Sequence, residues 1–527
     1  MTTRTNKGGQ DASQIAKKNV PLPLIMGVIA RQTIKGSIAN YLGIAIGFVT
    51  TFFVLTDCLS ADEIGLTRIL VDAAMLFSSL AMLGANNSII RFYPYFKEED
   101  GSDHGFFAWA LLLPLVGFLL FAIAFVLCKN GIVTLYAEHS QLFTKYVYHL
   151  LPLTFFALYT TVFESCSNVL MRIAVPKFVR EVLIRLCNLV AYLLYGHSII
   201  SLDLFVFLFC TSYAIAATVD FCYLLSMGKI SFRIDRHFIT TQMVRRILGY
   251  TLITTVVSLS SNVQLFNSLF IGAQGGLAMA GVYTIASYIA NVIGVPSRSL
   301  LAISGPVVAQ SMKEGDIGTV NQLAQKVSLH QLLVSSMLYF FICINLNALY
   351  SVIPNGANYV AGTAVVLIMG FSNIISQTCS IVIPVLNYSN RYILSLPFTL
   401  LLTITALTLN ALLIPLMGVS GAATATLGAA LIYNISQLVY VHCKLKISIF
   451  SKRQISIVAI MVLLALLERL WTWLLTPLMP HVLIDAIAKS GILAVIAILL
   501  TLRANISDDV NNLFFNIYNK LRRKGNK

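Results

Sequence analysis

Apolar runs of about 20 residues, each long enough to cross a bilayer, recur along almost the whole chain. Short polar or charged segments separate them, and this pattern predicts fourteen transmembrane helices. The expected spans are 38–58, 66–90, 105–128, 147–171, 179–196, 202–226, 248–272, 279–304, 329–353, 363–386, 393–416, 420–443, 455–476 and 483–502. We therefore expect an all-α polytopic membrane protein.

The segments between the spans suggest how the chain is divided. The expected parts are a leader with an interfacial helix (1–36), a first lobe of six spans (37–227), a basic linker (228–247), a second lobe of six spans (248–443), a final pair of spans (444–504) and a basic amphipathic tail on the cytoplasmic leaflet (505–527).

Composition agrees with a membrane protein: 57% of the 527 residues are hydrophobic and 11% are charged, against about 25% charged in an average soluble domain. The formal charge is +15. With the N-terminus in the cytoplasm, cytoplasmic segments hold about 30 of the 36 Lys and Arg residues, so both termini are expected there. No basic domain with interleaved aromatic residues is present, which argues against a nucleic-acid partner. The nine cysteines are scattered and form no CxxC or Cys/His cluster, so neither a metal site nor a disulfide framework is expected.

The eighth expected span carries an arginine, Arg298, which costs a few kcal/mol inside a membrane unless it faces a bundle interior or a watery cavity. Three polar residues share its face within an arc of about 60° on a helical wheel: Thr284, Ser287 and Asn291. This face is expected to line a cavity. The alternative is that these groups only hydrogen-bond to neighbouring helices.

The start of this span repeats an earlier stretch of the chain. Gly281 begins GVYTIASYIANVIGVPSRSL, and Gly65, 216 residues earlier, begins GLTRILVDAAMLFSSLAML. This offset covers about six spans, an even number, so the two copies would have the same orientation in the membrane. We expect two lobes related by an axis along the membrane normal.

The second span also has a polar face, on which Arg68, Asp72, Ser79 and Asn86 fall within about 40°. Arg68 and Asp72 are four residues apart and close enough to pair. Matching helices of the two halves thus each carry an arginine, and both are expected to face the cavity. The alternative for Arg68 is that its side chain reaches the outer interface.

Other polar residues within spans are less decisive. Gln264 and Asn267 lie on one side of the seventh span and are assigned to the same cavity. Glu164 and Asp220 are lone carboxylates in the fourth and sixth spans, each a candidate for carrying a coupling H⁺ or Na⁺ or for pairing with an arginine.

Four charged residues of the last two spans are expected to satisfy one another or to tie these spans to the rest of the bundle. They are Glu468, Arg469, Asp485 and Lys489.

Three stretches carry a resemblance to a known family. NALLIPLMGVSGAATATLGAAL (410–431) resembles the Asn-x-x-Leu-Ile-Pro-x-x-Gly-x-x-Gly-Ala-Ala-x-Ala-Thr signature of bacterial polysaccharide flippases. GVYTIASYIANVIGVP (281–296) and LGANNSIIRFYPYF (83–96) resemble the start of their eighth helix and the end of their second. With the fourteen-span count, the resemblance covers most of the chain. The sequence is similar to the Wzx-like oligosaccharide flippases of the multidrug/oligosaccharidyl-lipid/polysaccharide exporter superfamily.

The resemblance implies two pseudo-symmetric six-helix lobes in a MATE-like V, a central cavity and two extra C-terminal helices. It also implies a flippase of the bacterial cytoplasmic membrane that moves an undecaprenyl-pyrophosphate-linked oligosaccharide outward by alternating access, for surface polysaccharide such as O-antigen. Glycosyltransferases and a polymerase are the implied partners besides membrane lipids, with no cofactor beyond a coupling ion. Arginines suit a pyrophosphate, whose oxygens they bind bidentately. Many relatives have an acidic residue where this chain has Asn267, which argues against ion coupling through that span.

Two alternatives remain at this point. A multidrug exporter of the same superfamily would need aromatic and acidic groups for cations, whereas the polar centres found here are basic. A polysaccharide polymerase or ligase would need a sizeable outer loop with catalytic Arg or His, but the longest outer loop, 129–146, holds only His139 among histidines. No Ser-His-Asp or paired-carboxylate arrangement is evident either. We therefore expect a transporter rather than an enzyme.

Overall fold

The structure is a computed structural model that describes residues 22–96, 103–227, 240–389, 391–507 and 511. In these ranges the chain is helical and has no strand, and twelve helices are long and apolar enough to cross a membrane. The two other expected spans, 179–196 and 248–272, are also mostly helical. The prediction of an all-α multi-pass membrane protein is confirmed.

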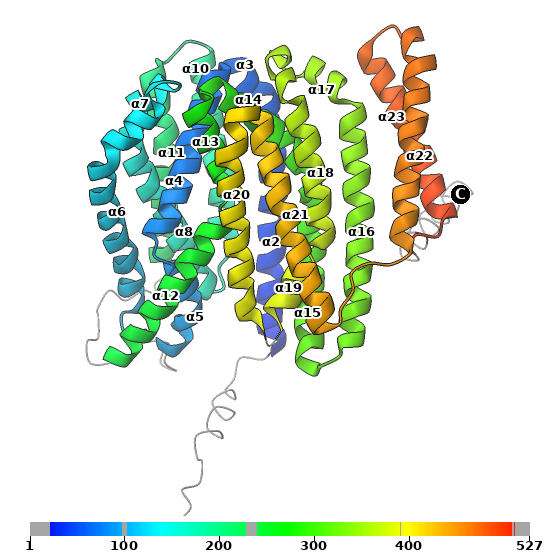
Figure 1. The fold of residues 1–527 in the computed structure, drawn as a ribbon. Helices are drawn as coiled ribbons and strands as arrows, with labels where there is room; N and C mark the ends of the chain where they lie inside the picture. Colours follow the sequence, from blue (N-terminus) through cyan, green and yellow to red (C-terminus); the bar gives the residue numbers. More distant parts are fainter. Residues whose placement is uncertain (1–21, 97–102, 228–239, 390, 508–510, 512–527) are drawn as a thin grey trace, which may run out of the picture.

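The first half of the bundle is built around α4 and α8, with α2 at its inner edge (Figure 1). Its elements are α2 (Leu22–Val49), η1 (Thr50–Leu55), α3 (Thr56–Cys58), α4 (Ala61–Ala81), α5 (Ala85–Phe96), α6 (Phe106–Ala137), α7 (Gln141–Tyr146), η2 (Val147–His149), α8 (Leu150–Val169), α9 (Ala174–Phe178), η3 (Val179–Leu183), α10 (Ile184–Gly196) and α11 (Leu202–Ser226). Here η1 and η3 are π-helical turns, and η2 is a 3₁₀ turn.

The second half packs α14, α18, α20 and α21 together. Its elements are α12 (Thr241–Ser261), α13 (Leu265–Gln274), α14 (Leu277–Asn291), η4 (Val292–Gly294), α15 (Val295–Glu314), α16 (Ile317–Ile344), α17 (Leu346–Val352), η5 (Gly356–Gly362), α18 (Thr363–Cys379), α19 (Val382–Asn387), η6 (Tyr392–Leu394), α20 (Ser395–Met417) and α21 (Val419–Leu445).

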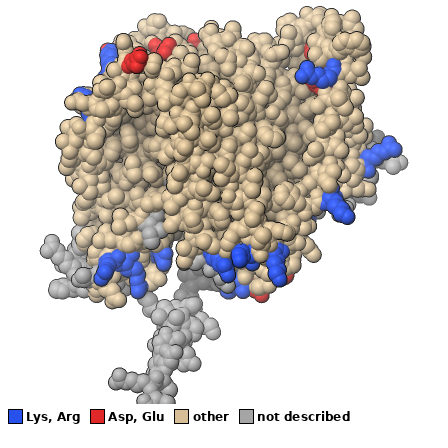
Figure 2. Space-filling model, in the orientation of Figure 1, with Lys and Arg blue, Asp and Glu red and all other residues tan. Residues whose placement is uncertain are grey.

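The last helices, α22 (Arg453–Leu474), η7 (Thr476–Leu478) and α23 (Val482–Arg503), stand at the edge of the bundle beside α16 (Figure 1). The middle of the bundle around α20 and α21 shows no charged atoms on the face in Figure 2, whereas Lys and Arg gather at its lower end. This distribution is typical of a protein whose apolar middle lies in lipid.

Several boundaries differ from the sequence prediction. Helix α2 is continuous from Leu22 to Val49, without a break where the first span was expected to begin. Helix α6 runs to Ala137 rather than 128. Helix α16 begins at Ile317 rather than near 329, because the Asp316 carboxylate accepts a hydrogen bond from the Thr319 backbone N–H (3.0 Å) and caps the helix. The start of the leader, most of the basic linker and most of the tail lie outside the described residues.

Another difference concerns the second span, which is two helices rather than one. Helix α4 ends at Ala81, and Leu83 and Gly84 both have positive φ before α5 begins. Asn86 therefore does not share the helical wheel of Arg68. The break is tightly packed, because a Cβ on Gly84 would lie 2.5 Å from the Thr251 carbonyl oxygen of α12.

The two repeated stretches meet directly, since α4 and α14 pack against each other at the start of both helices. A Cβ added to Gly65 would lie 2.0 Å from the Leu277 carbonyl oxygen, and one added to Gly281 would lie 2.1 Å from the Ala61 carbonyl oxygen. Ala61 and Leu277 are themselves 216 residues apart, as 277 − 61 = 216. We call these reciprocal contacts the glycine seam.

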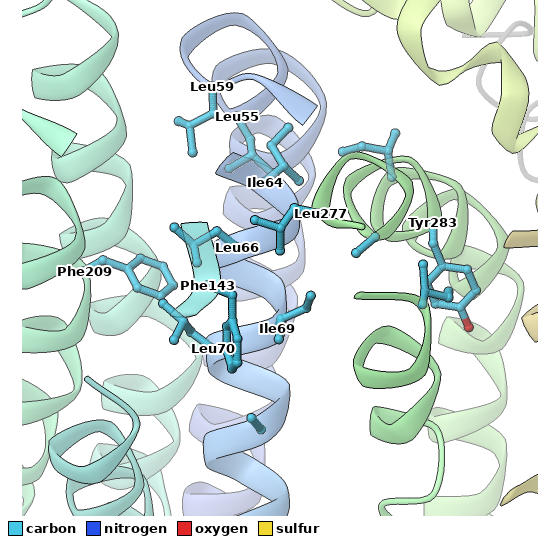
Figure 3. Packing of buried hydrophobic residues seen from close by; sticks show 14 of the residues in the cluster. Leu55, Leu59, Ile64, Leu66, Ile69, Leu70, Phe143, Phe209, Leu277 and Tyr283 are labelled. Atoms are coloured by element: carbon cyan, nitrogen blue, oxygen red, sulfur yellow. The ribbon is translucent and has the colours of Figure 1, made fainter. Parts of the chain in front are cut away.

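Apolar packing surrounds the seam. Leu66, Ile69 and Leu70 of α4 are fully buried, and they belong to one cluster with residues of α8, α11 and α14 (Figure 3). This continuous core holds the first half of the bundle against the second, and it fixes the helices that carry the polar residues discussed next.

Candidate functional site

A cavity of about 780 Å³ lies between the two halves. Its walls come from α2, η1, α4, η3, α10 and α11 on one side and from α14, η4, α15 and α18 on the other. Four arginines line it: Arg68, Arg180, Arg185 and Arg298. Among the described lining residues Glu181 is the only acid, so the cavity wall is cationic.

Arg68 extends from α4 into this cavity and also contacts the other half of the protein. Its Nε donates to the Asp72 carboxylate (2.7 Å), and its Nη1 donates to the Tyr288 hydroxyl of α14 (3.3 Å). Asp72 is buried and does not line the cavity; it also accepts a hydrogen bond from the Ser268 hydroxyl (2.5 Å). The carboxylate therefore holds the guanidinium in place while one edge of it still faces the cavity.

Arg298 lies in the first turn of α15, just after Pro296. Proline fits this position because its fixed φ suits a helix start and its missing N–H would have no partner there. The exposed Arg298 side chain has no hydrogen bond or ion pair to any described residue. This corner of the cavity therefore carries a positive charge that suits an anion.

Arg180 and Arg185 were not predicted from the sequence. They lie on η3 and α10, where Arg180 pairs with Glu164 (2.7 Å) and Glu181 (3.4 Å), and Arg185 pairs with Glu181 (3.1 Å). The available signal was the presence of three charged residues, 180, 181 and 185, in an otherwise apolar span. Intramembrane charges of this kind usually mark a functional site.

Helix α2 is shaped to receive these arginines. A Cβ on Gly43 would lie 2.6 Å from the Glu181 carbonyl oxygen, and one on Gly47 would lie 2.0 Å from Arg185 Nη1. The Arg185 guanidinium also donates to the Gly43 carbonyl. The π-helical turn η1 begins three residues later, and such turns are frequent at functional sites.

Three more of the predicted residues line the cavity: Thr284, Asn291 and Gln264. Thr284 is buried and donates to the Ala280 carbonyl, whereas Asn291 is exposed and accepts from Asn373 at 3.4 Å. Ser287 is absent from the cavity lining, is buried, and donates to the Thr284 carbonyl.

Asn86 and Asn267 lie away from this cavity. Asn86 is on α5, beyond the break after α4. Asn267 is buried in the second half, where it donates to Tyr283 and Thr426 and accepts from Asn410, each at 2.8 Å. These four residues form a neutral network that ties α13, α14, α20 and α21 together.

The two lone carboxylates lie on α8 and α11, two helices that pack against each other. Glu164 on α8 pairs with Arg180, and Asp220 on α11 is fully buried. Neither Asp220 oxygen has a hydrogen-bond partner among the described residues.

Three of the four charged residues predicted to satisfy one another in the final helix pair do so, and Arg469 is the exception. Lys489 lies 3.8 Å from Glu468 and 3.7 Å from Asp485, and the Trp471 indole donates to Asp485 (2.8 Å). Asn345 donates to Ser490 (2.7 Å), which ties α23 to the second half. These contacts connect helices and lie outside the cavity.

Comparison with solved structures shows the fold. The structure titled "Lipid II flippase MurJ, inward closed conformation" aligns with a TM-score of 0.64 and 14% identity, over 88% of this chain and 98% of that one. An inward-facing multidrug resistance MATE family transporter of the MOP superfamily aligns with a TM-score of 0.59 and 14% identity, over 79% and 98%. A Vibrio cholerae MATE transporter aligns with a TM-score of 0.50 and 12% identity, over 80% and 98%.

The chain thus has the fold shared by MurJ and the MATE transporters. No protein-family model matches the sequence, and no curated protein matches it either. At 14% identity the likeness establishes the fold, and the site residues must carry the argument about function.

Proposed function

We propose that the protein is a flippase, rather than an enzyme, that moves an undecaprenyl-pyrophosphate-linked oligosaccharide from the inner to the outer leaflet of the bacterial cytoplasmic membrane. The observation that carries the proposal is the cationic cavity. Arg298 has no partner among the described residues, and three other arginines keep part of their side chains exposed. Guanidinium groups bind phosphate oxygens bidentately, and a site between two lobes suits alternating access.

In this mechanism the pyrophosphate binds Arg298 in the second half and Arg68 in the first, so the bound anion bridges the halves. The sugars occupy the rest of the cavity, whose volume lies within the usual range for ligand sites, and the lipid tail stays in the bilayer. Both termini lie in the cytoplasm, where glycosyltransferases supply the substrate. A polymerase uses the product on the outer side.

The test uses a strain that lacks the protein. We expect a complete lipid-linked repeat unit to accumulate on the inner leaflet, to be cleared by the wild-type protein, and to persist with Arg298→Ala. Arg298→Lys keeps the charge without the bidentate geometry and should clear it only in part. Arg469→Ala is the matched control, because this arginine is exposed on α22 outside the cavity.

Mass spectrometry of extracted intermediates measures the outcome, with each variant compared at equal protein level. Clearance by Arg298→Ala equal to wild type would overturn the role of this residue. Normal intermediates together with altered drug susceptibility would instead indicate a multidrug exporter.

A further inference from the structure

Asp220 is an unusual group in this fold. It is fully buried on α11, and neither carboxyl oxygen has a hydrogen-bond partner in the described part of the chain. Its sequence neighbours Ala217, Phe221 and Leu224 belong to an apolar cluster. An ionised carboxylate in such a place costs several kcal/mol, so a proton on Asp220 is the state that fits this geometry.

A second carboxyl group, that of Glu164, lies on the neighbouring helix α8. Helices α8 and α11 pack together, and the rings of Phe163 and Phe221, each adjacent in sequence to one of the two acids, are 5.3 Å apart. Two carboxyl groups at such a site favour a state in which at least one holds a proton.

Arg180 connects this pair with the cavity. Its Nη1 donates to Glu164 at 2.7 Å, while about half of its side chain is exposed where it lines the cavity. Glu164 is mostly buried and therefore depends on Arg180 for its charge to be balanced. An anion that binds Arg180 from the cavity competes directly with Glu164.

We infer that Glu164 and Asp220 form a proton-binding pair behind Arg180, and that a phosphate anion bound to Arg180 draws one proton onto the pair. This inference rests on the proposed anion-binding function. Without anion the pair holds one proton, on Asp220, and Glu164 is ionised. When the anion binds Arg180 in place of Glu164, the Glu164 carboxylate binds a proton delivered through the water of the cavity and forms an O–H bond. Glu164 releases this proton when the anion dissociates.

Other charged groups lie on the elements packed against α8 and α11. Arg180, Arg185 and Lys177 are the basic residues of η3, α10 and α9, and Arg91 is that of α5. Glu181 pairs with both Arg185 (3.1 Å) and Arg180 (3.4 Å), and Asp72 of α4 is held by both Arg68 and Ser268. Glu164 differs from these two acids because Arg180, which lines the cavity, is its single partner among the described residues.

The test uses the purified full-length protein in lipid nanodiscs, with inorganic pyrophosphate as the probe. Calorimetric titration at pH 7 in two buffers of different ionisation enthalpy gives the number of protons bound per pyrophosphate. For each pyrophosphate bound, the wild type should take up several tenths of a proton more than Glu164→Gln. Pyrophosphate itself changes protonation equally in both experiments, so its contribution cancels in this difference. Glu164→Gln should also bind pyrophosphate several-fold more tightly, because the competing carboxylate is gone.

Glu138→Gln is the control, since Glu138 is exposed at the end of α6, and it should behave as the wild type. Infrared difference spectra of Asp220→Asn test the other half of the pair. This variant should fold normally and lose one carbonyl band of a protonated carboxyl group at neutral pH.

Equal proton uptake in wild type and Glu164→Gln, or no such band assigned to Asp220, would overturn the inference while leaving the flippase proposal in place. Failure of the wild type to bind pyrophosphate at all would overturn both.

Discussion

The glycine seam makes a quantitative prediction about conformation. An alanine Cβ at position 281 would lie 2.1 Å from the Ala61 carbonyl oxygen, whereas an ordinary C···O contact is about 3.3 Å or longer. The two helices must therefore separate by about 1 Å where they cross. Overpacking of this kind costs about 1–3 kcal/mol. The better helix propensity of alanine does not change this balance, because position 281 is helical whether or not the two helices touch.

This cost of about 1–3 kcal/mol applies only to conformations in which α4 and α14 touch. Gly281→Ala should therefore shift the population about 5- to 150-fold toward conformations that are open at this end of the bundle. The assay is the labelling rate of a cysteine introduced at Thr67, which lines the cavity, in a cysteine-free background with a reagent that cannot cross the membrane. The seam end lies outside in the proposed orientation, so labelling from outside should accelerate.

Gly131→Ala is the matched control, because an added Cβ there has no neighbour within 4 Å, and it should leave the labelling rate unchanged. If Gly281→Ala also left the rate and the thermal stability unchanged, the seam would not be a contact that opening must break, and the reasoning would be refuted.

Two further substitutions separate stability from transport. Arg68→Ala removes the partner of buried Asp72 and should lower the free energy of unfolding by about 3–5 kcal/mol. The double variant Arg68→Ala/Asp72→Asn should recover much of the thermal stability. No recovery would show that the two residues are not coupled. Asp485→Asn removes one of the two acidic partners of Lys489. The melting temperature should fall by an amount equivalent to about 1–3 kcal/mol. Clearance of lipid-linked intermediates in cells should stay normal. A loss of clearance at unchanged protein level would instead show that the last helix pair takes part in transport.

Much of the fold follows from the apolar runs, because a membrane span needs about 20 such residues wherever it lies. Positions along a single helix, such as the Arg68–Asp72 pair, were also predictable, since four residues make about one helical turn. The break after Ala81 was not, because it depends on positive φ at Leu83 and on the fit of Gly84 against α12. For the same reason Asn86 was placed on the wrong helix.

The cavity shows the same limit. That Arg298 lines the cavity could be predicted from its own helix. The Asn267 side chain instead contacts Tyr283 and Asn410, and these contacts depend on how four helices pack together. Arg180 and Arg185 reach the cavity because η3 packs on the glycines of α2, a contact between distant segments. Helix periodicity carries no information about which neighbour a polar face meets.

The glycine seam has the geometry of an isologous interface, in which each partner offers the other the same surface. Gly65 contacts the backbone of residue 277, and Gly281 contacts the backbone of residue 61 in the same way. The crossing would therefore be self-complementary if both helices came from copies of one half. Only backbone atoms are approached, so the difference between Ala61 and Leu277 does not disturb it. The crossing within this single chain thus has the symmetry of a twofold dimer contact.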